Sequence, residues 1–200
     1  MVAIIDYGMG NLASVKKALD YLNVDNAITS DSKIIRSSSH IVLPGVGSFL
    51  QGMKNLKKLE LDKILTEQVL EKKTNFLGIC LGMQLLAETG YEPCENEGLG
   101  WIKGEVLKLE DPSVKIPHMG WNNIDIYNDA FYQDLPSSDF YFIHSYHFVP
   151  KSESVIAAKV NYGLDYVASI QQDNIFATQF HPEKSQQAGL KVLESFFSNA

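Results

Sequence analysis

The feature that most constrains this chain is an apolar run that ends at a cysteine, Asn75-Phe76-Leu77-Gly78-Ile79-Cys80-Leu81-Gly82-Met83-Gln84. Glycines stand two residues before and two residues after Cys80. A sharp bend from a strand into a helix strains the residue at the bend and requires small neighbours. The pattern therefore predicts a strand over 76–79, a bend at Cys80 and a helix from Leu81 to Glu88.

At such a bend Cys80 would lie at the N-terminus of a helix, where unpaired N–H groups and the helix dipole favour a thiolate. Cys80 is therefore a candidate nucleophile. The alternative is a small buried apolar residue, which free cysteines often are. The second cysteine, Cys94, is interpreted as an ordinary thiol. Two cysteines, one of them assigned to chemistry, predict a reducing cytoplasm rather than a disulfide framework.

A second element lies about 100 residues downstream, where a strand-like run ends in His181-Pro182-Glu183. A residue before proline favours extended backbone, so His181 and Glu183 are expected to project to the same side. Taken separately, His181 is explained as a polar residue at the end of a strand, and Glu183 as a solvated charge at the start of a helix. Together with the cysteine bend they predict a Cys-His-Glu triad of nucleophile, base and orienting carboxylate.

The first half of the chain alternates short apolar runs with amphipathic segments. Residues 2–6 and 41–43 are strand-like, whereas 12–22 and 61–72 have helical spacing. Such alternation predicts parallel strands joined by helices. The expected fold class is therefore α/β, with an open, mostly parallel sheet that is flanked by helices.

The second half of the chain, from 104 to 179, is richer in short strand-like runs and predicts an antiparallel portion. These runs cover 155–160, 167–172 and 175–179. A last helix over 186–198 is expected to bury a face with Leu190, Leu193 and Phe197. Neither repeats nor linkers interrupt the chain, so residues 1–200 are predicted to form a single domain.

Composition argues against several classes of function. No run of about 18 apolar residues is present, so no membrane span is predicted. Asp6 ends the first apolar run too early for a signal peptide. The net charge of −7 argues against a nucleic-acid partner, and the lysines over 54–63 alternate with acids, as on a solvated helix face. No metal site is predicted, because the histidines at 118, 144, 147 and 181 are scattered in the sequence.

These motifs resemble the class I, or triad, glutamine amidotransferase family, and the match runs nearly end to end. The cysteine bend and the His-Pro-Glu element mark that class. Pro44-Gly45-Val46-Gly47 and His118-Met119-Gly120-Trp121-Asn122 resemble the glutaminase subunits of imidazole glycerol phosphate synthase. The resemblance implies hydrolysis of L-glutamine to glutamate and ammonia through a thioester on Cys80, with no cofactor.

The resemblance also implies which residues hold the substrate. Backbone N–H groups in a glycine-rich loop and next to the nucleophile would stabilise an oxyanion, and residues on the helix and on a later strand would hold the amino-acid part of glutamine. The positions are Gly45, Val46, Gly47, Leu81, Gln84, Ser145 and Tyr146. A strain-relieving turn at the loop and a solvent-facing Gln84 are the alternatives.

Since the chain has no second domain to use ammonia, the resemblance implies a HisF-like (β/α)8-barrel synthase subunit as partner. In histidine biosynthesis this barrel makes imidazole glycerol phosphate and an aminoimidazole carboxamide ribotide. The residues implied near the contact are Met9, Gly10, Asn11, Trp121, Tyr141 and Lys184. The alternative explanations are a turn for residues 9–11, a core aromatic for Trp121, a strand aromatic for Tyr141 and a surface lysine for Lys184.

Two other readings of the chemistry remain open. His147 stands where the histidine-pathway members usually have tyrosine, so the chain is also compatible with a paralogue that supplies ammonia for amination of a surface-polysaccharide sugar. A stand-alone cysteine hydrolase would use the same bend. Against it stand the Pro44–Gly47 loop and the residues from Gln179 to Glu183, which together favour an amidotransferase.

Overall fold

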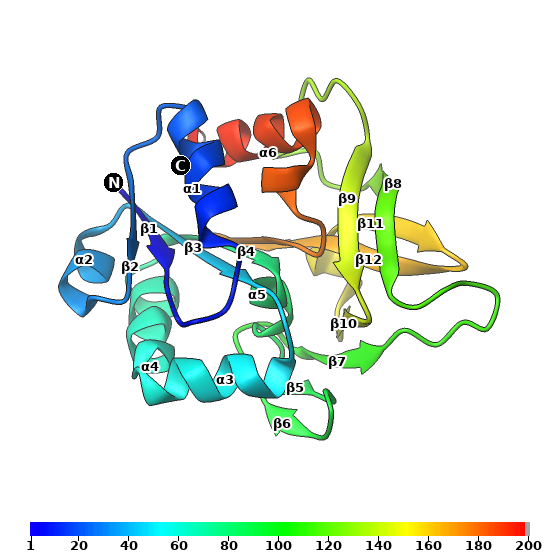
Figure 1. The fold of residues 1–200 in the computed structure, drawn as a ribbon, viewed down its shortest axis with the longest axis horizontal. Coiled ribbons are helices and arrows are strands. Elements are labelled where there is room, and N and C mark those ends of the chain that lie inside the picture. Colours follow the sequence, from blue (N-terminus) through cyan, green and yellow to red (C-terminus); the bar gives the residue numbers. More distant parts are fainter. Residues whose placement is uncertain (199–200) are drawn as a thin grey trace.

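The computed structural model describes residues 1–198, which build two sheets and a set of helices that pack on the larger sheet (Figure 1). The larger sheet has nine strands in the order β2-β1-β3-β4-β13-β12-β11-β8-β9. Its first five strands run parallel: β2 (Asn26–Thr29), β1 (Val2–Ile5), β3 (His40–Gly45), β4 (Asn75–Cys80) and β13 (Ile175–Thr178). The parallel strands predicted from the first half of the sequence are confirmed. β13, from the half expected to be antiparallel, departs from the prediction because it pairs parallel with β4 and antiparallel only with β12.

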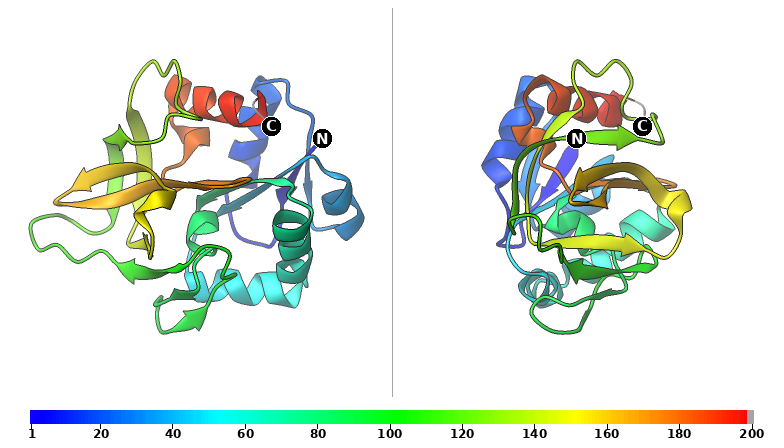
Figure 2. Two further views of the ribbon diagram at one scale, coloured as in Figure 1. Left: turned by 180° about the vertical axis from the view of Figure 1, so that it is seen from behind. Right: turned by 90° about the vertical axis from the view of Figure 1, so that its right-hand side faces the viewer.

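The other four strands of this sheet pair antiparallel, as expected for the second half of the chain. They are β12 (Leu164–Gln172), β11 (Ile156–Tyr162), β8 (His118–Ile126) and β9 (Asp139–His144). The hairpin of β11 and β12 extends away from the helical part of the molecule (Figure 2, left). A smaller sheet in the order β10-β7-β5-β6 contains β10 (Tyr146–Pro150), β7 (Gly104–Lys108), β5 (Thr89–Gly90) and β6 (Asn96–Glu97).

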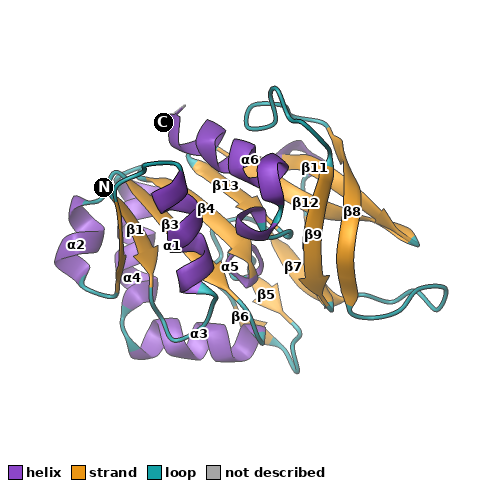
Figure 3. Ribbon diagram, turned by 45° about the horizontal axis from the view of Figure 1, so that its top comes forward, coloured by secondary structure: helices purple, strands orange, loops and turns teal. Residues whose placement is uncertain are grey.

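Helices cover both faces of the parallel strands (Figures 1 and 3). α1 (Leu12–Tyr21) and α6 (Gln186–Ser198) lie on one face, and α2 (Ser32–Ser37), α3 (Phe49–Lys58), α4 (Leu61–Thr66) and α5 (Leu81–Gln84) on the other. The alternation of strand side chains creates two cores. In β1, Ala3 and Ile5 enter the core under α3 and α4, and Val2 and Ile4 enter the core under α1 and α6.

Two of the expected helices differ from the prediction. The helix after Cys80 ends at Gln84 rather than Glu88, because the next carbonyl groups accept bonds from another segment. Leu99, Gly100 and Ile102 donate to the carbonyls of residues 85–87, which are then not free to continue the helix. The helix expected over 61–72 becomes a π-helix from Glu67 to Glu71, where Lys72 N–H donates to the Glu67 carbonyl at 3.0 Å.

The last helix, α6, has the predicted bounds but a rotated buried face. Val192, Leu193 and Phe196 are buried, whereas Leu190 and Phe197 are only partly covered. Single-turn 3-10 helices occupy Glu153–Val155 and Pro182–Lys184. Among residues 1–198, no helix combines the length and apolar character needed to cross a membrane.

Candidate active site

Cys80 ends the central parallel strand β4 and begins α5, as the sequence predicts. Its backbone has φ 55° and ψ −107°, a strained conformation for a residue with a side chain. The flanking glycines are required by close packing: a Cβ on Gly82 would lie 1.8 Å from the Leu43 carbonyl oxygen, and one on Gly78 would lie 2.9 Å from the Gly82 carbonyl oxygen. Packing against β3 therefore fixes the bend that presents the Cys80 thiol.

His181 follows β13, the strand that pairs with β4, so residues far apart in the sequence meet at one edge of the sheet. The His181 N–H donates to the Tyr141 carbonyl at 2.9 Å. The ring Nδ1 lies 2.8 Å from Glu183 Oε1, and both side chains are only 2% exposed. Burial rules out the solvated-charge explanation of Glu183.

The route by which Glu183 reaches the ring differs from the prediction. We expected an extended chain through His181 and Glu183, but Pro182–Lys184 forms a 3-10 turn. Proline at the start of that turn allows the chain to reverse, and the turn swings the carboxylate of Glu183 back to the imidazole that precedes it. The contact was predicted correctly, and its backbone geometry was wrong.

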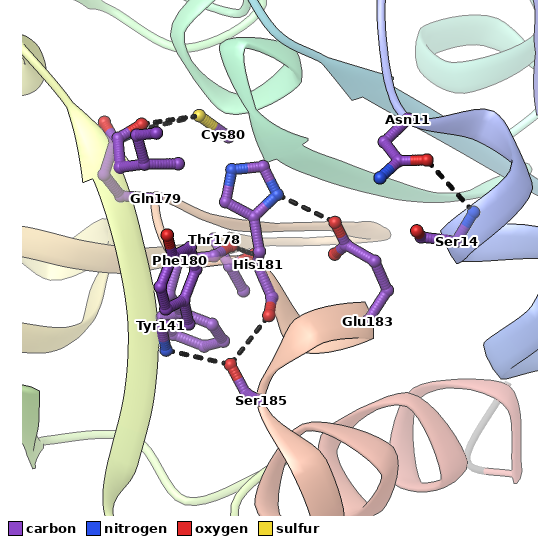
Figure 4. A network of polar contacts seen from close by, with 11 residues as sticks. Asn11, Ser14, Cys80, Tyr141, Thr178, Gln179, Phe180, His181, Glu183 and Ser185 are labelled. Carbon is purple, nitrogen blue, oxygen red and sulfur yellow. Dashed lines mark hydrogen bonds and ion pairs between the residues drawn. The ribbon is translucent and has the colours of Figure 1, made fainter. Parts of the chain in front are cut away.

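The imidazole of His181 lies beside Cys80 (Figure 4). Its Nε2 is buried and makes no hydrogen bond within residues 1–198, whereas Nδ1 bonds Glu183. Burial lowers the pKa of His181, but the negative charge of a Cys80 thiolate, and next that of Glu183, outweigh burial and raise the pKa to about 10. The site therefore favours the charged, imidazolium form of His181.

A cleft of about 360 Å³ opens directly at the Cys80 thiol. Most of the predicted substrate-binding residues line it, namely Val46, Gly47, Leu81, Gln84, Ser145 and Tyr146. Gly45, in contrast, is not among the lining residues: it is the last residue of β3, where an added Cβ would stand 2.2 Å from the Tyr7 hydroxyl. Close packing against Tyr7 is thus a structural reason for glycine at position 45.

Gln84 is buried, which excludes the solvent-facing alternative. Its Nε2 donates to the Tyr146 carbonyl at 2.8 Å and to Gln179 Oε1 at 3.1 Å. The Gln179 amide in turn donates to Cys80 Sγ at 3.7 Å. Two buried amides therefore connect the wall of the cleft to the sulfur, a role of Gln179 that the sequence did not reveal.

Glu92 is a cleft residue that the sequence analysis missed. Its Oε2 accepts a hydrogen bond from the Phe49 N–H at 3.0 Å, which holds the carboxylate at the N-terminus of α3. Partial burial raises the pKa of Glu92, although the Phe49 bond opposes the shift. The segment from 91 to 95 is irregular in structure, so no periodic pattern marked this carboxylate.

The histidines are less scattered than the sequence suggested. His118 and His144 face each other across β8 and β9, with His118 Nδ1 3.0 Å from His144 Nε2. His147 packs on Tyr166, with ring centroids 4.7 Å apart, and is not one of the residues that line the cleft. Within residues 1–198, no three His, Cys, Asp or Glu side chains are grouped so that they could hold a metal ion.

The residues implied near a partner form two groups on either side of the site. Trp121, Tyr141 and Lys184 lie together: the first two rings are 6.0 Å apart, and Lys184 Nζ is 5.9 Å from the Tyr141 ring centroid. Trp121 is 49% exposed and is therefore not a core aromatic. In the second group Met9 and Gly10 approach the 44–47 loop, and Asn11 caps α1.

Comparison with known proteins agrees with this geometry. The chain matches the family described as Glutamine amidotransferase class-I over residues 3–200. Imidazole glycerol phosphate synthase subunit HisH 1 of Campylobacter jejuni is 54% identical over 98% of both chains. The HisH subunit of Aquifex aeolicus is 49% identical over 96% of this chain and 94% of its own.

Solved structures show the same fold at lower identity. A crystal structure of a glutamine amidotransferase superposes with a TM-score of 0.78 at 19% identity and covers all of both chains. The fold and the cysteine bend define a class I glutamine amidotransferase. Within that family the chain belongs to the HisH proteins, because full-length relatives reach 54% identity.

Proposed function

We propose that this protein is the glutaminase subunit of an imidazole glycerol phosphate synthase. It would hydrolyse L-glutamine to glutamate and pass the ammonia to a separate synthase subunit. The observation that carries the proposal is the buried His181–Glu183 pair beside the strained Cys80, at the floor of a cleft in a HisH-family chain. A reactive thiol must stay reduced, which fits a protein of the cytoplasm.

The reaction begins with attack of the Cys80 thiolate on the side-chain carboxamide carbon of glutamine. The negative charge that forms on the amide oxygen would be stabilised by backbone N–H groups of Val46, Gly47 and Leu81, all of which line the cleft. The imidazolium of His181 then gives its proton to the amide nitrogen, the carbon–nitrogen bond breaks and ammonia leaves. A γ-glutamyl thioester remains on Cys80.

Water completes the cycle. Neutral His181 takes a proton from a water molecule, which adds to the thioester carbon; the carbon–sulfur bond breaks, and glutamate and the thiolate are released. Glu183 holds the Nδ1–H side of the ring and stabilises its charged form. The proton of the new γ-carboxyl group passes to solvent, so that every proton and bond of the cycle is accounted for.

Recognition of glutamine, rather than of amides in general, requires contacts to its ammonium and carboxylate groups. We assign the ammonium to the carboxylate of Glu92, and the amino-acid part to Gln84 and to the backbone of Ser145 and Tyr146. Glu92 is the one carboxylate among the cleft-lining residues, so it is the natural partner of a positive charge there. Charge complementarity supports an α-amino acid substrate.

The partner would be a HisF-like (β/α)8 barrel. Free ammonia in water becomes ammonium, which is not a nucleophile, so transfer requires an enclosed path at a docked face. The two groups that flank the site, Met9–Asn11 on one side and Trp121 with Tyr141 and Lys184 on the other, form the proposed contact. Exposed Met119 and Trp121, at 58% and 49%, supply apolar surface for it.

Reconstitution with the barrel tests the proposal. The two purified subunits are mixed, and glutamate is measured with and without the acceptor nucleotide of the histidine pathway. We expect the acceptor to increase glutamine turnover and to incorporate nitrogen from ¹⁵N-amide glutamine. Increased turnover only with a nucleotide-sugar acceptor and its own barrel would favour the paralogue, and equal turnover without any barrel would favour a stand-alone hydrolase.

A further inference from the structure

A series of hydrogen bonds through two buried histidines runs from strand β8 to the glutamine cleft, outside the triad. Asn122 Nδ2 lies 3.4 Å from His118 Nε2, and His118 Nδ1 lies 3.0 Å from His144 Nε2. His144 Nδ1 lies 2.9 Å from the Tyr146 carbonyl oxygen. His118 and His144 are 2% and 6% exposed, so water does not replace these partners.

The donor and the acceptor of each hydrogen bond in this series follow from its inner end, the Tyr146 carbonyl. The Tyr146 carbonyl can only accept, so His144 Nδ1 must carry a hydrogen. Burial lowers the pKa of His144 to about 3 and that of His118 to about 4, and both rings are therefore neutral at pH 7. His144 Nε2 then has no hydrogen and must accept from His118 Nδ1–H.

The same logic continues to the surface end of the chain. His118 Nε2 is then an acceptor, and Asn122 Nδ2 supplies the hydrogen. The second hydrogen of that amide points to the Asn161 carbonyl at 2.9 Å. Phe142 and Tyr162 stack on the two sides of the His118 ring, with centroids 4.7 and 4.0 Å away. Position and tautomer are thus both fixed.

At its inner end the chain reaches groups that form the active site. The Tyr146 carbonyl accepts from His144 and also from Gln84, which lines the cleft. The other hydrogen of the Gln84 amide goes to Gln179, and Gln179 donates to Cys80 Sγ. If the Tyr146 carbonyl moved after losing its bond to His144, the Gln84 amide would therefore lose this hydrogen-bond partner as well.

We propose that His118 and His144 are positioning residues for the glutaminase, locked as neutral Nδ1–H tautomers that fix the Tyr146 carbonyl and, through it, the Gln84 side of the glutamine cleft. The inference rests on the proposed glutaminase function. His144 lines the cleft and His118 does not, and we assign to neither ring a bond to the substrate carboxamide or to the reacting sulfur. Their removal should therefore weaken glutamine binding more than the chemical step.

Two variants of one residue separate the hydrogen bond from packing. His118→Phe keeps a ring between Phe142 and Tyr162 but donates nothing to His144. His118→Asn places an amide N–H near the position of Nδ1 and can restore the donor. His40→Phe, another buried histidine with aromatic neighbours but on the opposite end of β3, is the control for general damage.

Steady-state glutamine hydrolysis in the complex with the barrel gives the readout. We expect His118→Phe to raise KM for glutamine about tenfold, which corresponds to about 1.4 kcal/mol, with kcat changed less than about threefold. His118→Asn should recover most of the loss. An unchanged KM in His118→Phe, no recovery in His118→Asn, or an equal rise in His40→Phe would each overturn the proposal.

A spectroscopic measurement keeps the proposal testable if a variant fails to fold. ¹⁵N NMR of the wild-type histidine side chains at pH 7 should show both His118 and His144 as neutral Nδ1–H tautomers. Detection of an Nε2–H tautomer or of a charged ring at either residue would refute it. This measurement needs no activity, so it stands apart from the glutaminase assay, in which a wild-type complex that releases no ammonia would instead refute the proposed function.

Discussion

The two sides of the cleft hold their functional groups by different means. The nucleophile side, formed by β3, β4, α5 and the 44–48 loop, relies on backbone fit, because a Cβ at Gly82 would collide with β3. The recognition side, formed by β8, β9, β10 and the end of β13, relies on buried side-chain hydrogen bonds such as that of His118 to His144. A fixed backbone presents the thiol, and a polar network shapes what binds beside it.

The largest effect should come from Cys80 on the nucleophile side. Cys80→Ala removes the atom that forms the thioester, so we expect kcat to fall at least about 10⁵-fold. Release of ammonia from glutamine in the complex with the barrel measures the loss. Cys94→Ala, at an exposed thiol, is the matched control and should leave the rate unchanged. Residual activity within tenfold of wild type would remove Cys80 from the mechanism.

Glu183 on the recognition side should have the next largest effect. Glu183→Gln keeps the shape of the side chain but removes a charge that, after that of Cys80, helps to raise the pKa of His181. A neutral amide can also present a hydrogen to Nδ1 and impose the wrong tautomer. We expect kcat to fall on the order of 10⁴-fold. The pH profile of kcat/KM supplies the check, since a triad in which Glu183 only packs would keep both the rate and the profile.

Glu92 should affect binding rather than chemistry. Glu92→Gln can still accept the hydrogen bond from Phe49, but it removes the charge that we assign to the substrate ammonium. A charged hydrogen bond contributes about 1.5–3 kcal/mol, so KM for glutamine should rise about 10- to 100-fold while kcat stays close to wild type. Glu95→Gln, an exposed acid on the same segment, is the control. Equal KM values in the two variants would argue against the assignment.

The same division explains what could be predicted from the sequence. The bend at Cys80 is a local backbone feature, and it requires glycine at neighbouring positions, where it can be seen in the sequence. The contact of Glu183 with His181 was also predictable, since only Pro182 separates them. In contrast, His118 and His144 are 26 residues apart and meet only through the register of β8 and β9. Residues that pair across strands have no fixed spacing in the sequence, so this contact could not be predicted.

Segments whose backbone bonds go to distant partners were predicted least well. The helix after Cys80 was expected to reach Glu88, but the carbonyls of Leu85 and Leu86 accept from Leu99 and Ile102 instead. That early stop leads the chain into the irregular segment that carries Glu92. These non-local backbone bonds shorten the helix, and Glu92 then lies in a segment without the periodicity that sequence analysis can detect.

The smallest expected effect is a dependence of stability on pH that arises on the recognition side. Below pH 6.5 the unfolded chain protonates its histidines, whereas burial keeps folded His118 neutral until pH about 4. The unfolded state then binds more protons, so the free energy of unfolding falls as the pH drops from 6.5 toward 4. For His118 alone the fall should be about 1–2 kcal/mol between pH 7 and pH 5.

Urea unfolding of wild type and His118→Asn at these two pH values isolates this contribution. Asparagine does not titrate, so the variant should lose less stability on acidification than the wild type does, even where it is less stable at pH 7. Equal losses in the two proteins would mean that folded His118 takes up a proton as readily as a solvated histidine. In that case the donor and acceptor inferred for the His118–His144 hydrogen bond would be wrong. The recognition side of the cleft would then lack the buried hydrogen bond that best distinguishes it from the nucleophile side.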